Sequence, residues 1–164
     1  MTLYVLSIDP GIINCAFVVL SITFEPLCVE ILESHTKVIG SYKSTDWIVC
    51  QVHLHHILNE ISSRYCLDYL ICEEQPYCID GTIKRIECIN VVLFSGICMY
   101  ATARGIKFIK TNPKSWHAKY LQKQKKSIRL YKSMKLPFIM IKRRLLQSVH
   151  EYDAMFIATY QFNK

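Results

Sequence analysis

The hydrophobic and polar positions along the chain change their period several times, and each change marks a predicted element. Apolar, β-branched runs over 3–9, 15–21 and 27–34 predict three strands, the first two joined by a short Pro/Gly/Asn turn. The wholly apolar run 69–72 predicts a strand buried on both faces. Residues 107–111 predict a fifth strand.

Between and after these strands the period becomes helical. Apolar residues at helical spacing predict helices from about 46 to 65 and from 149 to 162. Residues 83–104 are apolar nearly all round, which predicts a long helix, and Gly105 is a suitable residue to end it. One face of that helix must meet the sheet, and the other is free to meet a second subunit.

Two more predicted helices complete the order. Asn112-Pro113 predicts an N-cap followed by proline at the first position of a helix that runs to Tyr120. The basic tract 123–135 predicts another helix, which Pro137 ends. The order β-β-β-α-β-α-β-α-α predicts an α/β fold, with a mixed five-stranded sheet of three antiparallel and then two parallel strands, and helices on both faces. No repeat or linker is evident, so residues 1–164 are expected to form one domain.

Charge is distributed very unevenly along the 164 residues. The net charge is +7, but residues 1–104 carry −5 and residues 105–164 carry +12. Between Lys107 and Arg144 there are 13 basic residues and no acidic one. This asymmetry favours a protein that brings a polyanion to an acidic site. The hydrophobic fraction of 51% excludes a disordered chain.

The cysteines and the apolar runs bear on the cellular setting. None of the eight cysteines forms a C-x-x-C pair, and most lie within apolar runs. This pattern is typical of small buried side chains in a reducing, intracellular compartment. No run is long enough to span a bilayer, and no secretory signal is evident at the start.

Candidate chemistry lies where predicted strands end and where the last helix begins. Asp9 ends the first strand at a Pro-Gly turn, and Glu73 and Glu74 follow the strand at 69–72. Adjacent strand residues point to opposite faces, so only one of the two glutamates can share a face with Asp9. His150 and Asp153 share a helical face. Each acid alone has an ordinary structural explanation, but together they favour a site for two Mg²⁺ or Mn²⁺ ions that hydrolyses a phosphodiester.

Three short motifs, in this order, resemble the acidic motifs of RuvC-type Holliday junction resolvases. They are Ile8-Asp9-Pro10-Gly11, Glu73-Glu74-Gln75-Pro76 and His150-Glu151-Tyr152-Asp153-Ala154. The second motif is most similar to the Glu-Arg-Gln-Pro of the poxvirus branch, which implies that Glu73 is the functional acid, whereas the bacterial Glu-Gln pattern would favour Glu74. Poxvirus relatives have Asp at the position of His150, and some bacterial relatives resemble this chain in having His there.

The resemblance covers residues 3–162 and implies an RNase H-like fold with a metal site. Mg²⁺, for which Mn²⁺ could substitute, would be held by Asp9, Glu73 or Glu74, His150 and Asp153. His150 would be a metal ligand or serve proton transfer. The tract Lys123-Gln124-Lys125-Lys126-Ser127 is similar to the lysine-rich segment of the family, which implies a catalytic lysine at 125 or 126. The expected DNA contacts are Lys114, Lys119, Lys123, Lys125, Lys126 and Arg129.

The resemblance also implies a homodimer that makes paired symmetric nicks across a four-way DNA junction, with an interface through the helix at 83–104. If the chain is viral, the poxvirus-like second motif implies the host cytoplasm. Two alternatives remain open from the sequence. One is an RNase H or another nuclease of the same fold, and the other is a non-catalytic basic protein that binds nucleic acid.

Overall fold

The structure, a computed structural model, describes residues 1–11, 13–40, 46–74, 85–122 and 124–163, with the backbone alone for 85–90. The predicted loop around Asp80-Gly81 lies outside these ranges. So does the candidate DNA contact Lys123.

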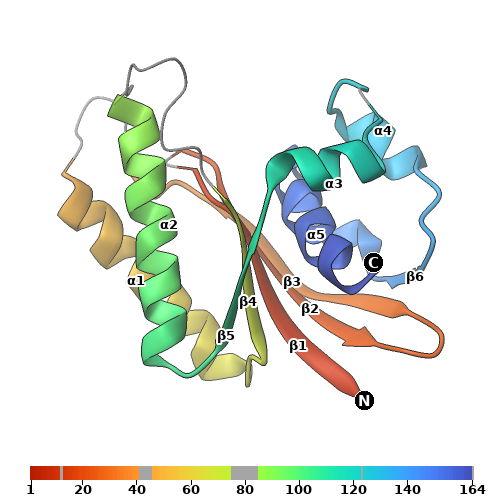
Figure 1. Cartoon of the computed structure of the whole chain (residues 1–164), viewed down its shortest axis with the longest axis horizontal. Coiled ribbons are helices and arrows are strands. Elements are labelled where there is room, and N and C mark those ends of the chain that lie inside the picture. The colour runs from red at the N-terminus through yellow and green to blue at the C-terminus, as the bar shows by residue number, and fades with distance from the viewer. Residues whose placement is uncertain (12, 41–45, 75–84, 123, 164) are drawn as a thin grey trace.

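The strands form one mixed sheet in the order β5-β4-β1-β2-β3-β6 (Figure 1). Their bounds are β1 Thr2–Asp9, β2 Cys15–Thr23, β3 Cys28–Lys37, β4 Tyr69–Glu73, β5 Lys107–Thr111 and β6 Ile139–Ile141. β1, β2 and β3 are antiparallel neighbours, whereas β4 pairs parallel with β1 and with β5, and β6 pairs parallel with β3. The predicted mixed α/β architecture is confirmed, with one strand more than the five predicted.

The helices of the described chain cover both faces of this sheet. They are α1 Trp47–Arg64, α2 Arg85–Ala103, α3 Pro113–Tyr120, α4 Ile128–Ser133 and α5 Val149–Phe162, with a short 3₁₀ helix, η1, at Arg143–Leu145. Figure 1 shows α1 and α2 on one side of the sheet and α3, α4 and α5 on the other. Two separate apolar cores fill these two layers. None of the described helices combines the length and apolar character needed to cross a membrane.

Residue types at the helix ends explain why these helices begin and end where they do. Asp46 caps α1 by accepting from the backbone N–H of Ile48, and Asn112 caps α3 with Pro113 at the first position. Gly105 follows α2 with a φ of +67°, a conformation that glycine adopts without strain.

The basic tract departs from its prediction. The helix expected over 123–135 is only α4, because Ser127 is its N-cap and accepts from the N–H of Leu130. Residues 124–127 precede the helix, so Lys125 and Lys126 do not lie on a helical turn. β6 was missed because three residues after a proline give no recognisable period, and only pairing with the edge of β3 defines the strand.

Candidate active site

The register between β1 and β4 brings two acidic side chains together. Ile8 pairs with Cys72 in the parallel ladder, so the next residues, Asp9 and Glu73, end the two strands side by side. Alternation along a strand then decides the face. Ile71 belongs to the core beneath α5, so Glu73 points to the same layer, as does Asp9 on β1.

Glu74 has a different environment. Its carboxylate pairs with Lys110 at 3.0 Å, and its backbone N–H donates to the carbonyl of Thr111 beside the end of β5. The charges of Asp9 and Asp153 act on Glu73 and raise its pKa, so Glu73 is the glutamate that faces the cluster.

The beginning of α5 supplies the other side chains of the site. His150 Nδ1 lies 3.0 Å from Asp9 Oδ2. Asp9, His150 and Asp153 each offer one ligand atom within 4.8 Å of the others. Asp153 is 3% exposed and Asp9 13%, whereas His150 at 40% faces solvent. Two strand ends and one helix start therefore converge, although 141 residues separate Asp9 from His150.

Glu151 lies between His150 and Asp153 in the sequence, but its side chain contacts the sheet and the start of α5. Its N–H donates to the N-cap hydroxyl of Ser148, and its carboxylate accepts from the N–H of Gln147 at 2.6 Å. The same carboxylate accepts from the hydroxyls of Ser34 and Thr36 on β3. Glu151 thus fixes the start of α5 to the sheet, which sets the orientation of His150 and Asp153.

Two carboxylates of the cluster, those of Glu73 and Asp153, accept hydrogen bonds from side chains in the C-terminal half of the chain. Trp116 Nε1 donates to Glu73 Oε1 at 2.9 Å. Tyr131 donates its hydroxyl to Asp153 Oδ1 at 2.5 Å, and Lys126 Nζ lies 2.7 Å from Asp153 Oδ2. Trp116 is fully buried, so its ring is part of the core and does not face solvent. Tyr131 gave no signal in the sequence, since only the packing of α4 on α5 brings it to Asp153.

Burial and mutual repulsion raise the pKa values of two acids of this cluster, Asp9 and Glu73. Burial is the main cause that raises the pKa of Asp9, with the charge of Asp153 adding to it. Burial and the charge of Asp9 raise the pKa of Glu73 to about 7. The hydrogen bond to Asp9 raises the pKa of His150. Clustered carboxylates with raised pKa values are typical of a site that binds a cation.

The donor set fits a hard divalent cation. Three carboxylates and one imidazole on rigid elements match the oxygen-rich coordination that Mg²⁺ and Mn²⁺ prefer. Within the described ranges, Asp9, His150 and Asp153 are the one group of three whose ligand atoms lie close enough to share an ion.

The candidate lysines differ in their contacts. Lys126 touches Asp153 and lies 4.9 Å over the Trp116 ring, while Lys125 is exposed and has no polar partner in the described structure. Lys119 donates to the carbonyl of Asn163. Lys114, with Lys126, lines a mainly apolar pocket of about 390 Å³ beside the cluster, whose other lining residues are His117, Ala118, Leu121 and Gln124. Arg129 is exposed on α4.

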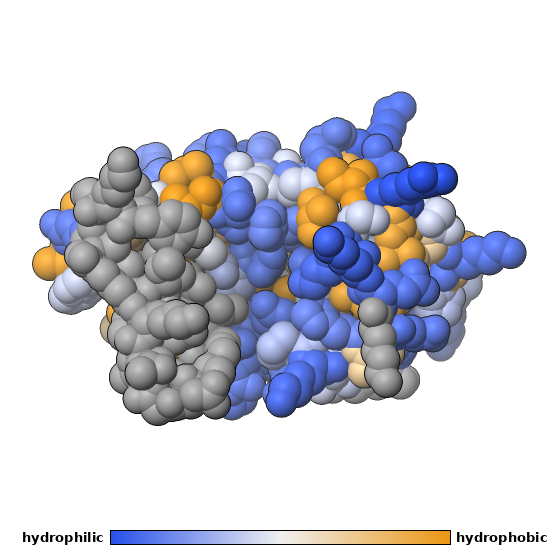
Figure 2. Space-filling model, turned by 90° about the horizontal axis from the view of Figure 1, so that it is seen from above, coloured by the Kyte–Doolittle hydropathy of each residue, from blue (hydrophilic) through white to orange (hydrophobic). Residues whose placement is uncertain are grey.

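The surface at this end of the sheet combines hydrophilic side chains with apolar patches. Figure 2 views the molecule from the side on which the β1–β2 turn lies, and long hydrophilic side chains project there on the side of α3 and α4.

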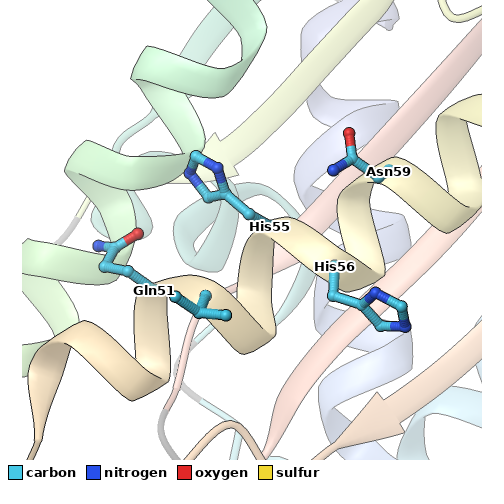
Figure 3. A pocket seen from close by; sticks show the side chains of 5 residues that line it. Gln51, His55, His56 and Asn59 are labelled. Atoms are coloured by element: carbon cyan, nitrogen blue, oxygen red, sulfur yellow. The ribbon is translucent and has the colours of Figure 1, made fainter.

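The histidines of α1 do not join the cluster. His55 and His56 line a pocket of about 370 Å³ on the outer layer, and Figure 3 shows their rings pointing in different directions. His55 packs edge-on against Tyr100, with 5.6 Å between ring centroids.

Solved Holliday junction resolvases have a fold similar to that of this chain. Thermus thermophilus RuvC, in complex with a Holliday junction substrate, superposes with a TM-score of 0.71 at 16% identity, over 98% of this chain and 92% of RuvC. The chain has the RuvC-type resolvase fold. The yeast mitochondrial Holliday junction resolvase Ydc2 gives a TM-score of 0.64 at 14% identity, over 95% of this chain and 77% of Ydc2. The fowlpox virus Holliday junction resolvase gives 0.62 at 15% identity, over 99% of each chain.

No protein-family model and no curated protein sequence matches the chain, so the similarity to these resolvases is found in the structure. The resemblance indicated by the three acidic motifs is therefore confirmed at the level of the fold.

Proposed function

We propose that this protein is a Mg²⁺-dependent endonuclease that resolves four-way DNA junctions by paired symmetric nicks. The observation that carries the proposal is the cluster of Asp9, His150 and Asp153, whose ligand atoms lie within 4.8 Å of one another at one end of a RuvC-type sheet. Glu73 ends the strand beside Asp9. Junction resolution is the activity named for the solved structures with this fold, and a site rich in carboxylates beside a basic segment suits a phosphodiester substrate.

In this proposal Asp9, Glu73 and Asp153 hold two metal ions, with His150 as a further ligand or a proton carrier. Mn²⁺ is expected to substitute for Mg²⁺. When bound, the ions supply an activated water and stabilise the leaving oxygen. His150 faces solvent on one side and is hydrogen-bonded to Asp9 on the other, so it could exchange a proton with solvent. Lys126 brings a positive charge to the rim of the cluster, where a phosphate would lie.

The DNA is proposed to approach over α3, α4 and the segment between them. Lys114, Lys125 and Arg129 expose their charges there, and the apolar pocket next to Lys126 could receive an unstacked base of a branched substrate. The net charge of +12 in residues 105–164 would supply most of the affinity, so binding should weaken steeply with salt.

A homodimer is proposed because a four-way junction offers two equivalent strands, one to each active site. α2 was the expected interface, and in its described part Met99 is 70% exposed. The neighbouring helix α1 also exposes an apolar stripe, and we therefore extend the proposed interface to it. The stripe consists of Trp47, Ile48, Val49 and Val52.

A substrate panel tests the activity. The protein is incubated with Mg²⁺ and, in parallel, with a four-way junction, a linear duplex and an RNA–DNA hybrid, alongside the Asp9→Asn and Asp153→Asn variants. Junction cleavage by the wild type is expected, and Asp9→Asn should reduce the rate by about 10³-fold or more while junction binding persists.

The other outcomes identify the alternatives. Preferential cleavage of the hybrid would assign an RNase H activity. Salt-dependent binding without turnover on any substrate would assign a non-catalytic nucleic-acid-binding protein.

A further inference from the structure

Two aromatic side chains from α3 and α4 donate hydrogen bonds to the acidic cluster. Trp116 on α3 and Tyr131 on α4 are both fully buried. Each donates one hydrogen bond to one oxygen of a carboxylate, Trp116 to Glu73 and Tyr131 to Asp153. A buried donor is expected to have such a partner, but here both partners are members of the candidate metal site.

Aromatic side chains of α5 pack against these two donors and hold them in place. The Trp116 ring stacks on Phe156, with 6.4 Å between centroids and 14° between planes. Tyr131 packs against Phe156 at 5.4 Å and stacks on Tyr152 at 5.3 Å. Because Phe156 lies one turn after Asp153 on α5, the same helix carries the acid and the ring that supports both donors.

The local chemistry of α4 explains why Tyr131 and Lys126 reach the same acid. Ser127 is the N-cap, which makes Lys126 the residue before the cap and Tyr131 the fourth residue of the helix. These two positions are neighbours at a helix start, where an apolar pair often packs. In this chain both side chains instead contact Asp153, one at each oxygen.

We propose that Trp116 and Tyr131 are positioning residues of the metal site. Each holds one oxygen of its carboxylate and so directs the other oxygen toward a bound cation. For Asp153 that second oxygen already contacts a cation, the ammonium of Lys126. The inference rests on the proposed function, since it deepens the description of the same site. Outer hydrogen bonds of this kind orient metal ligands and sustain their affinity.

Binding of Mn²⁺ to the metal-free full-length protein, followed by the electron paramagnetic resonance signal of the free ion, provides the test. Tyr131→Phe and Trp116→Phe are each expected to weaken Mn²⁺ binding by about 10- to 100-fold. Tyr120→Phe is the matched control, because Tyr120 packs on the same Phe156 at 4.7 Å but donates to none of the four candidate ligands. It should bind Mn²⁺ as the wild type does.

Double variants show whether each ring acts through its own acid. The effect of Tyr131→Phe should vanish in an Asp153→Asn background and persist in Glu73→Gln, and the reverse is expected for Trp116→Phe. Equal effects in both backgrounds would indicate general loosening of the core and would overturn the proposal.

A further measurement needs no change at either ring. In a Trp47→Phe background Trp116 is the one tryptophan left, and its fluorescence should change on titration with Mg²⁺ and respond weakly when Glu73→Gln is added. No response to Mg²⁺ would overturn the proposal. A wild type that binds Mn²⁺ but cleaves no junction would reject the proposed function and leave this inference standing. A wild type that cleaves junctions while Tyr131→Phe binds Mn²⁺ normally would reject this inference alone.

Discussion

His150 Nδ1 and Asp9 Oδ2 lie 3.0 Å apart, so a single hydrogen bond joins the last helix to the end of the first strand. The hydrogen bond to Asp9 raises the pKa of His150, so the imidazolium persists to higher pH. A cation that binds between Asp9 and His150 would displace the proton that the two side chains share.

Replacing His150 tests that pair. His150→Ala should lower junction cleavage by about 10²-fold or more, because it removes either a ligand or a proton carrier beside Asp9. Single-turnover cleavage and junction binding are measured together, and binding is expected to hold. His56→Ala on α1 is the control, and equal losses in the two variants would contradict a role for His150.

The two candidate lysines can be separated in the same way. Lys126→Met should reduce cleavage by about 10²-fold or more, because Lys126 is the one that touches the acidic cluster. Lys125→Met should leave cleavage at saturating DNA almost unchanged. Each variant should reduce the slope of binding against salt by about one if both lysines contact phosphates. A larger cleavage defect in Lys125→Met would reverse the assignment.

The metal-free protein should become less stable as pH rises. The pKa of Glu73 is raised from an ordinary 4.5 to about 7, so the folded state favours the protonated acid. The stability that this preference provides is complete below pH 4.5 and is lost as pH rises through 7. The raised pKa values of Asp9 and His150 act in the same direction. The upper limit from Glu73 alone is about 3 kcal/mol.

Thermal unfolding in a chelating buffer measures this effect between pH 5 and pH 8. Glu73→Gln should flatten the profile and raise the Tm at pH 8, and Mg²⁺ should restore the wild type at that pH. Glu74→Gln is the neighbouring control, because Glu74 pairs with Lys110 outside the cluster. A profile that Glu74→Gln flattens and Glu73→Gln does not would show that the wrong glutamate has been assigned.

Charge placed on the apolar stripe of α1 should prevent dimerisation. Val52 is 66% exposed, and Val52→Glu would bury a charge in the proposed interface. Light scattering after size exclusion should show a monomer, with junction cleavage reduced to single nicks. Ile139→Glu, on the edge strand β6 and also exposed, should stay dimeric. Loss of the dimer in both variants would remove the stripe from the interface.

Much of this architecture follows from local sequence. The bounds of β5, α3 and α5 agree with their predicted ranges, because alternation and helical spacing report which side of an element is buried. The same patterns placed Asp9 and the two glutamates at strand ends and put His150 and Asp153 on one helical face. These features depend only on interactions between residues that are close in the sequence.

Tertiary structure decided the rest. The β1–β4 register brings Glu73 beside Asp9, while Glu74 pairs with Lys110 across the end of β5. Pairing at a sheet edge made β6 a strand, and packing against Phe156 placed Trp116 where it donates to Glu73. Such contacts join residues far apart in the chain, so their energies depend on packing that no local period records.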